Sequence, residues 1–418
     1  MEIKRNYYLN KLISKQNNKL IKIVTGIRRC GKSYLLDPIF RNYLLDNGVD
    51  ENHIIKLEFD SIENEEYTNP KKLYEYVMQK VVDKDTYYVI LDEIQKVSDF
   101  ESVLNSFLRK SNLDVYVTGS NSKFLSSDII TEFRGRGDEI RVYPLSFSEF
   151  MSVYSGNEIS GLNEYINYGG LPLITTFKSV EEKIDYLNFQ KDNVYINDVI
   201  ERNDIRNDEE LKTLIEIISS SIGSLTNPTK LYNTFISKGN KNITNKTIAS
   251  YLKYLEESFL IEKSKRFDVK GKKYIETPSK YYFVDIGIRN SLINFRQIEK
   301  THIMENIIYT ELRRRGFNVD VGIVEKRKID EKGKKDYRQL EIDFVANKGS
   351  DKYYIQSAYS IEDNNKKEQE LQSLLNISDN FKKMVIVYDS FIKWQDDNGI
   401  IYISIYDFLL NENSLKEA

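Results

Sequence analysis

Short apolar runs alternate with longer amphipathic stretches through the first third of the chain. The runs at 20–25 and 87–91 are almost wholly apolar or aromatic, which is typical of strands buried on both faces. Two further strands are predicted at 114–121 and 139–143, and a helix is predicted from Tyr34 to about Leu45. The alternation of strands and helices predicts an α/β domain built on a parallel sheet.

The spacing of apolar residues changes after residue 148. Residues 148–208 predict helices interrupted by Gly169-Gly170 and Pro172, the arrangement of a helical lid or connector. Residues 209–290 predict three helices and then a hairpin, which is the plan of a winged helix-turn-helix module. The third of these helices has Thr244 as its expected N-cap. Its apolar stripe at helical spacing consists of Ile248, Leu252, Leu255 and Phe259.

The last third has the order helix, three strands, helix, strand, which resembles the PD-(D/E)xK nuclease fold. The helix at 303–315 carries Glu305, and the strand at 340–345 alternates so that Glu341 and Asp343 share one face. Nuclease chemistry also needs a Glu and a Lys on the following strand, where this chain has Gln356 and Ala358. We therefore expect a degenerate site that does not cleave nucleic acid. A shift of Lys348 or Lys352 into the missing role stays open.

Together these patterns predict four parts in an α/β protein. They are an α/β domain with a parallel sheet at 1–150, a helical connector at 151–208, a winged-helix module at 209–290 and an α+β nuclease-like domain at 291–418. A chain of 418 residues has room for two to four domains of ordinary size.

Composition narrows the function classes. One cysteine, Cys30, excludes an internal disulfide framework, and two distant histidines make histidine-based metal sites and Ser-His-Asp chemistry poor candidates. The N-terminus lacks the apolar core of a signal peptide, and no apolar run is long enough to cross a bilayer, so we expect a cytoplasmic location and no membrane partner.

Charge is nearly balanced overall, with a formal net charge of −3, so any nucleic-acid surface has to be local. Residues 226–282 hold twelve Lys/Arg and five Asp/Glu, a local net charge of +7. This basic region is the candidate contact for DNA. A solvated basic face, or a winged helix that contacts protein or a second copy of the chain, explains the same charge.

Residues 26–33 have the spacing G-x-x-x-x-G-K-S between a predicted strand and a predicted helix. Such a loop cradles phosphates with its backbone N–H groups, while its lysine reaches the β- and γ-phosphates and its hydroxyl ligates Mg²⁺. The candidate nucleotide-binding residues are Gly26, Ile27, Arg28, Arg29, Cys30, Gly31, Lys32, Ser33 and Tyr34. ATP and Mg²⁺ are therefore the expected ligands.

Two carboxylates end the strand at 87–91. Asp92 is the candidate Mg²⁺ ligand beside Ser33, and Glu93 is the candidate general base that activates the attacking water. An adjacent acidic pair favours ATP hydrolysis over a GTP switch.

Two further residues are candidates for contact with the γ-phosphate. Asn121 ends the strand predicted at 114–121 and is the candidate polar sensor, with Ser120 as the alternative. Arg136, or Arg134, is the candidate arginine that stabilises transferred charge, either in its own chain or across a subunit interface. A simple turn at 119–121 explains the first segment equally well, and a basic surface loop at 134–137 explains the second.

The motifs together resemble bacterial and archaeal AAA-type ATP-binding proteins that carry a C-terminal domain of unknown function. This resemblance implies that residues 1–150 form a P-loop NTPase domain of the AAA/ASCE type. The resemblance covers nearly the whole chain, and it implies ATP binding, ATP hydrolysis and the roles given above for Lys32, Ser33, Asp92, Glu93 and Asn121. It rests on segments 26–33, 91–95, 117–122, 135–140, 144–150, 168–172, 198–202 and 341–344.

The sequence thus predicts an ATPase that couples Mg²⁺-dependent hydrolysis to rearrangement of its C-terminal half. Two alternatives belong to other classes: an ATP-switched DNA-binding regulator and an ATP-gated endonuclease.

Overall fold

The computed structural model describes residues 3–119, 135–237, 243–296, 299–329, 335–360 and 371–417. Contacts divide the chain into two compact units. The first comprises Met1–Pro144 with Glu257–Phe259, and the second comprises Leu145–Glu256 with Leu260–Ala418.

A five-stranded parallel sheet forms the centre of the first unit, in the order β2-β3-β4-β1-β5. Strand β4 lies between β1, which leads into the glycine-rich loop, and β3, which ends at the acidic pair. The carboxyl ends of these three strands therefore lie side by side, where open α/β sheets bind ligands. The strands are β1 (Ile21–Thr25), β2 (Ile54–Glu58), β3 (Tyr87–Asp92), β4 (Leu113–Gly119) and β5 (Gly137–Arg141).

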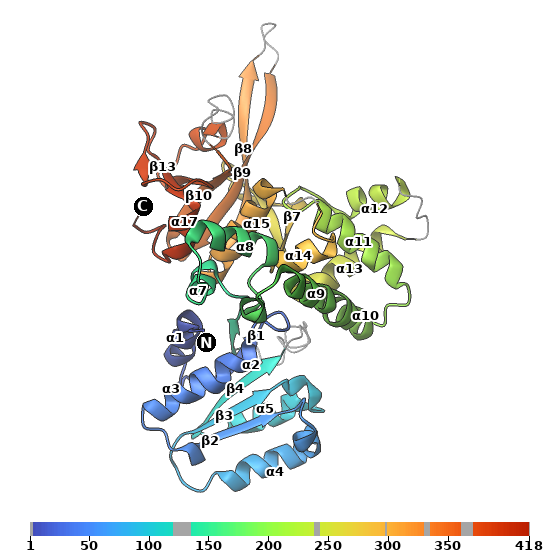
Figure 1. Cartoon of the computed structure of the whole chain (residues 1–418), viewed down its shortest axis with the longest axis vertical. Coiled ribbons are helices and arrows are strands. Elements are labelled where there is room, and N and C mark those ends of the chain that lie inside the picture. Colours follow the sequence, from blue (N-terminus) through green and yellow to red (C-terminus); the bar gives the residue numbers. More distant parts are fainter. Residues whose placement is uncertain are drawn as a thin grey trace. The chain divides into compact units, whose positions relative to one another are not determined.

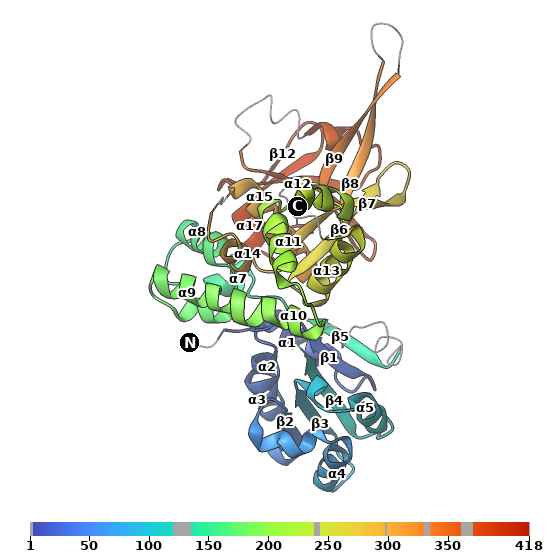
Figure 2. The same ribbon diagram turned by 90° about the vertical axis from the view of Figure 1, so that its right-hand side faces the viewer.

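Helices cover both faces of this sheet (Figures 1 and 2). Helices α4 and α5 contribute Leu73, Val77 and Phe107 to a buried cluster with one face of the strands. On the other face, Phe40 packs its ring against Tyr88 and Tyr116. The helices and helical turns are α1 (Asn6–Ser14), α2 (Lys32–Tyr34), η1 (Leu35–Phe40), α3 (Arg41–Asp46), η2 (Glu51–His53), η3 (Ile62–Thr68), α4 (Pro70–Lys80), η4 (Ile94–Lys96) and α5 (Phe100–Leu108).

The helix predicted from Tyr34 to Leu45 is kinked rather than continuous. Asp37 has extended backbone angles, φ −144° and ψ 116°, immediately before Pro38. Proline lacks an N–H donor, and its ring disfavours helical angles at the preceding residue. The kink divides the predicted helix into α2, η1 and α3.

The second unit begins with helices. Thr244 caps α13 as expected, because its Oγ1 accepts a hydrogen bond of 3.1 Å from the Thr247 backbone N–H. The helices and turns are α7 (Phe147–Met151), α8 (Glu158–Tyr168), η6 (Pro172–Thr176), α9 (Val180–Gln190), η7 (Lys191–Ile196), α10 (Asn197–Arg202), α11 (Asp208–Ser220), α12 (Pro228–Ser237), α13 (Asn245–Glu257), α14 (Ile286–Leu292), α15 (Lys300–Arg314) and α17 (Ile405–Leu410).

An eight-stranded sheet completes this unit, in the order β12-β13-β11-β10-β9-β8-β6-β7. The expected hairpin of the winged helix, β6–β7, is the end of this sheet, because β6 pairs in parallel with β8. One sheet therefore continues across the sequence boundary predicted at residue 290. The strands are β6 (Ile261–Asp268), β7 (Lys273–Phe283), β8 (Asn318–Ile329), β9 (Lys335–Lys348), β10 (Asp351–Ala358), β11 (Lys382–Val387), β12 (Trp394–Gln395) and β13 (Ile400–Ser404).

A buried polar joint connects the loop after α8 to the start of α14. Asp285 accepts hydrogen bonds from the backbone N–H of Gly170 at 2.7 Å and of Ile288 at 3.0 Å. Gly169 has φ +74°, and a Cβ there would lie 2.3 Å from the Asp285 carboxylate, so glycine is required. This joint gives the Tyr168–Pro172 motif a structural explanation.

In the described part of the chain, every helix is too short or too polar to cross a lipid bilayer.

Candidate nucleotide-binding site

The glycine-rich loop, residues 26–33, connects β1 to α2, as the sequence predicts. Gly26 and Gly31 have φ +143° and +93°, in the region that side chains disfavour. A Cβ at Gly26 would lie 2.1 Å from the carbonyl oxygen of Val142. Glycine at this position thus allows the loop to lie directly against the segment that follows β5.

Within the loop, Ile27 and Cys30 are buried, Arg28 is half-buried and Arg29 is exposed. The buried pair anchors the loop. Both arginines present positive charge beside it.

Lys32 and Ser33 begin α2. The Lys32 ammonium is buried and donates hydrogen bonds to the carbonyl oxygens of Gly26 at 3.0 Å and Ile27 at 3.1 Å. Its charge is therefore concentrated at the loop, where phosphate oxygens bind in such motifs. The Ser33 hydroxyl donates to the Asp92 carboxylate at 3.1 Å. Tyr34, also a predicted binding residue, is 45% exposed beside them.

Asp92 lies at the carboxyl end of β3, and Thr118 lies at the end of the neighbouring strand β4. The Thr118 hydroxyl donates to the Asp92 carboxylate and accepts a hydrogen bond of 3.0 Å from the Glu93 backbone N–H. Burial raises the pKa of Asp92, and the hydrogen bonds from Thr118 and Ser33 partly oppose that shift. Sequence reasoning did not select Thr118, although its place at a strand end beside the acidic pair is a usable signal.

This donor set fits a magnesium ion. A hydroxyl and a carboxylate oxygen are the ligands that Mg²⁺ takes from protein in phosphate-binding sites, with water and phosphate supplying the rest. The buried Asp92 carboxylate is electrostatically unfavourable alone, so a cation close to it would offset the cost of desolvation. Ser33 and Asp92 are the residues that would hold the ion.

Glu93 follows Asp92 with φ +53°, a left-handed backbone angle that is uncommon for a residue with a side chain. The Gln95 amide donates a hydrogen bond to the Glu93 carboxylate, which orients it. The predicted base is therefore adjacent to the predicted metal ligand and has a positioning partner that the sequence reading did not identify.

Arg5 supports the loop from its outer side. Its buried guanidinium donates hydrogen bonds to the carbonyl oxygens of Cys30 at 3.1 Å and Tyr143 at 2.7 Å. The N-terminal helix α1 is thereby fixed to the phosphate loop, a contact that no motif in the sequence indicates.

Arg136 does not lie beside the phosphate loop of its own chain. It precedes β5, and its carbonyl oxygen accepts a hydrogen bond of 2.9 Å from the N–H of Ile21, the first residue of β1. The loop begins at the other end of β1, about 16 Å away for a strand of this length. A role within one chain is therefore not supported by the geometry.

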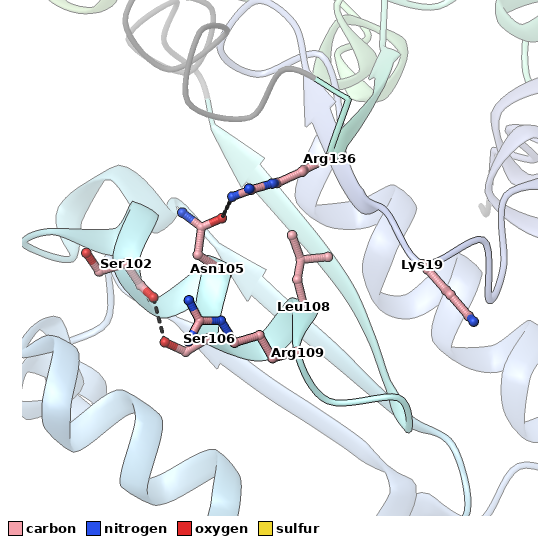
Figure 3. A pocket seen from close by; sticks show the side chains of 7 residues that line it. All are labelled: Lys19, Ser102, Asn105, Ser106, Leu108, Arg109 and Arg136. Carbon is pink, nitrogen blue, oxygen red and sulfur yellow. Dashed lines mark hydrogen bonds between the residues drawn. The ribbon is translucent and has the colours of Figure 1, made fainter.

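Arg136 instead lines a surface pocket of about 570 Å³ at the amino edge of the sheet (Figure 3). Its guanidinium donates a hydrogen bond of 3.0 Å to Asn105 on α5, and Lys19 and Arg109 add two more cations to the lining. Three further residues that the sequence predicts near the γ-phosphate lie outside the described residues. They are Asn121, its alternative Ser120, and Arg134, the alternative to Arg136.

The second unit holds a separate cluster of charged side chains around Lys280. The Lys280 ammonium on β7 lies 2.7 Å from Glu305, 2.8 Å from Glu341 and 3.8 Å from Asp343. Lys280 is among the basic residues of region 226–282 in the sequence. Its side chain is almost wholly buried, so it is not part of a basic surface. The tip lysines Lys263, Lys265, Lys270, Lys272 and Lys273 are exposed.

Electrostatics in this cluster follow from its composition. Burial raises the pKa of Asp343, with Glu305 adding to the shift. Burial would also raise the pKa of Glu305, but the Lys280 ammonium and hydrogen bonds from His302 and Tyr282 lower it overall. Burial would lower the pKa of Lys280, but the three carboxylates outweigh it and raise that pKa.

Lys280 therefore stands as a fixed cation beside Glu305 and Asp343, the two carboxylates that the sequence analysis compared with nuclease metal ligands. Neither lysine considered from sequence is seen there: Lys348 donates to the Arg315 carbonyl oxygen at 2.7 Å, and Lys352 lies over the rings of Tyr354 and Phe381. The Gln356 carbonyl oxygen accepts a hydrogen bond of 3.3 Å from the Asp343 N–H.

Comparison with known proteins finds a family model that matches most of the first unit. A model described as an AAA domain matches residues 18–151, and a model described as a domain of unknown function (DUF8612) matches residues 159–299. An uncharacterized protein of Haemophilus influenzae is 34% identical over 415 residues, covering 98% of each chain.

An uncharacterized protein of Methanocaldococcus jannaschii is 31% identical over 365 residues, which is 84% of this chain and 77% of that protein. Among solved structures, a Walker-type ATPase of Pyrococcus abyssi is 14% identical, with a TM-score of 0.49 over 70% of this chain and 96% of that one.

Proposed function

Because the chain belongs to the family of these bacterial and archaeal proteins and its residues 18–151 match an AAA domain, we propose that it binds and hydrolyses Mg²⁺-ATP. The observation that carries the proposal is the meeting of Ser33, Asp92 and Thr118 at the end of the phosphate loop. Three segments far apart in sequence supply these groups, and their chemistry is that of a metal-assisted phosphate site.

In the proposed mechanism, backbone N–H groups of the loop and the Lys32 ammonium bind the phosphates. Ser33 and Asp92 would hold a metal ion, which would supply positive charge to neutralise the phosphate oxygens. Glu93 accepts a proton from the attacking water, and Gln95 keeps the carboxylate in position. We propose Asn121 as the polar contact to the γ-phosphate.

Arg136 acts, in this proposal, on the nucleotide of a second copy. Arg136 lies at the amino edge of the sheet, whereas the phosphate loop of the same chain lies at the carboxyl edge. This separation supports action on a second copy. A guanidinium contributed by a neighbour lets assembly control hydrolysis.

We further propose that hydrolysis drives a conformational change of the second unit, which carries the exposed basic tip of the β6–β7 hairpin. DNA is the proposed partner of that tip. If ATP is only a switch, as in a DNA-binding regulator, turnover will be absent without DNA.

Calorimetry tests the proposal directly. Purified protein titrated with ATP or ADP in magnesium buffer should release or absorb heat with a stoichiometry near one, and Lys32→Ala should abolish it while the circular-dichroism spectrum is retained. Absence of nucleotide binding by folded wild-type protein would overturn the proposal.

An ATP-gated endonuclease is the second candidate, and the lysine beside Asp343 and Glu305 is the observation that favours it. Plasmid incubated with Mg²⁺ or Mn²⁺ and ATP should stay intact if Lys280 only neutralises the cluster. Cleavage that is lost in Asp343→Ala would establish the endonuclease instead.

A further inference from the structure

A pocket of about 630 Å³ lies at one end of the eight-stranded sheet, away from both the Lys280 cluster and the β6–β7 hairpin in the strand order. Its walls come from the start of β11, from β12 with the residue before it, and from β13. Nothing in the proposed ATPase mechanism uses this pocket, so its lining requires a separate explanation.

Two aromatic side chains form part of that lining. Trp394 is 38% exposed and Phe381 is 43% exposed, unusual values for such large apolar groups. One face of the Trp394 indole stacks on Tyr402, with ring centroids 4.0 Å apart and an angle of 2° between the planes. The indole is therefore held in a fixed orientation while much of it stays accessible.

The charged residues of the lining are three lysines and one aspartate, Lys382, Lys383, Lys393 and Asp379. Each lysine ammonium donates to a backbone carbonyl oxygen: Lys382 to Lys416 at 3.1 Å, Lys383 to Ile377 at 2.8 Å, and Lys393 to Glu417. For Lys383 and Lys393 the acceptor is a neutral carbonyl group, which orients the ammonium without cancelling its charge. These three cations are therefore held in place at the pocket.

The one carboxylate of the lining has other partners. Asp379 accepts hydrogen bonds from the Tyr354 hydroxyl at 2.6 Å and from the Phe381 N–H at 3.2 Å. The lining thus combines a net positive charge with two exposed aromatic rings. That combination suits a ligand with an aromatic ring and a negative charge.

We propose that this pocket binds a nucleobase together with its phosphate, supplied by a single-stranded nucleic acid. Stacking of bases on aromatic side chains and contact of phosphates with lysines are the two interactions by which proteins hold single strands. The volume is within the range of pockets that enclose one nucleotide-sized ligand. A free mononucleotide offers the same chemistry, so the experiment has to separate the two sources.

Trp394 is the single tryptophan of the chain, so its fluorescence reports on this pocket alone. In low-salt buffer without ATP, oligothymidylate of about twelve nucleotides should quench the emission saturably. An abasic oligonucleotide of equal length should quench little, because it has phosphates but no bases. Thymidine monophosphate should need a far higher concentration. Absence of quenching by the oligonucleotide, or equal affinity for the monophosphate, would overturn the proposal.

Variants then test the residues, with anisotropy of a labelled oligonucleotide as the measurement. Trp394→Ala should weaken binding about tenfold, and Trp394→Phe should restore most of the affinity, because phenylalanine also stacks. Lys393→Ala should weaken binding and lower the salt dependence by about one ion.

Lys71→Ala, on the exposed face of α4, is the matched control and should bind like the wild type. Lys272→Ala, at the exposed tip of the β6–β7 hairpin, tests the other surface that is proposed to contact nucleic acid. If Lys272→Ala weakens binding while the Trp394 variants do not, the strand binds the hairpin and the proposal fails. Thermal unfolding of each variant confirms that the fold is intact.

Discussion

At the scale of single residues, the candidate ATP site depends on side chains fixed at the ends of neighbouring strands. Asp92 ends β3, Thr118 lies near the end of β4, and the phosphate loop follows β1. Because β4 lies between the other two, its threonine hydroxyl can reach the carboxylate of Asp92 and the backbone of Glu93. Small changes at these positions should therefore separate binding from chemistry.

Glu93→Gln should retain ATP affinity and lose turnover, by about a hundredfold or more, because the amide keeps the shape of the carboxylate but cannot accept the proton. Phosphate release measures turnover, and calorimetry measures affinity. Glu75→Gln, on the exposed face of α4, is the control and should turn over normally. Hydrolysis by Glu93→Gln at the wild-type rate would remove Glu93 from the role of base.

Lys280→Met should destabilise the protein by roughly 3–5 kcal/mol, because it leaves three carboxylates without their buried cation. Urea unfolding measures the change, with the exposed Lys273→Met as the control. The deficit should shrink as the pH is lowered, because loss of the lysine raises the pKa of the buried Glu305 and Asp343 carboxylates in the folded variant, and protonation then neutralises them. A deficit that does not depend on pH would contradict the assignment.

The sequence selected Lys32, Ser33, Asp92 and Glu93 as candidates because a local motif fixes their spacing. It did not identify Arg5 or Lys280, whose partners are reached through tertiary contacts. Lys280 meets Glu305 only because β7 and α15 pack together, and no local pattern distinguishes it from the exposed lysines of the same hairpin.

At the scale of elements, the joint between α8 and α14 gives a prediction about pH. Burial raises the pKa of Asp285 from 3.8 to about 6, against hydrogen bonds from three backbone N–H groups. The folded protein therefore binds more protons at this group than the unfolded chain does between these values. Stability should fall as the pH rises from about 4 to 6, by roughly 3 kcal/mol from this group alone.

Asp285→Asn should remove that dependence, although the variant is less stable overall because an amide cannot accept from every N–H donor of the joint. The measurement is the difference in unfolding free energy between wild type and variant across pH 4–7. The exposed Asp397→Asn is the control and should leave the profile unchanged. A wild-type profile that matches the Asp285→Asn profile would contradict the prediction.

Most elements follow from periodicity, and the exceptions have local or topological causes. Strands β1, β3, β4 and β5 of the first unit form close to where the sequence predicts them, whereas the edge strand β2 was not predicted and the helix after the phosphate loop is kinked by Pro38. The hairpin at 261–283 also forms as expected. Its pairing with β8 depends on strands more than fifty residues later, which periodicity does not specify.

At the scale of the whole molecule, the position of Arg136 predicts that hydrolysis requires assembly. Specific ATPase activity should rise with protein concentration, and Arg136→Ala should lower turnover about a thousandfold. Arg109→Ala, in the same pocket, is the control and should retain most activity.

Mixing two inactive variants gives the sharper measurement. Lys32→Ala retains Arg136, and Arg136→Ala retains the phosphate loop, so a mixture should recover part of the activity. Activity that is unchanged on dilution, together with a mixture that stays inactive, would show that no arginine is shared between copies.

The parallel pairing of β6 with β8 also bears on how such chains diversify. A recombination that exchanged only the segment after residue 290 would bring a foreign β8 against the resident β6, and the two would have to match in register and side-chain size. We expect successful exchanges between relatives to have their crossover near residue 145, so that the entire second unit is inherited together.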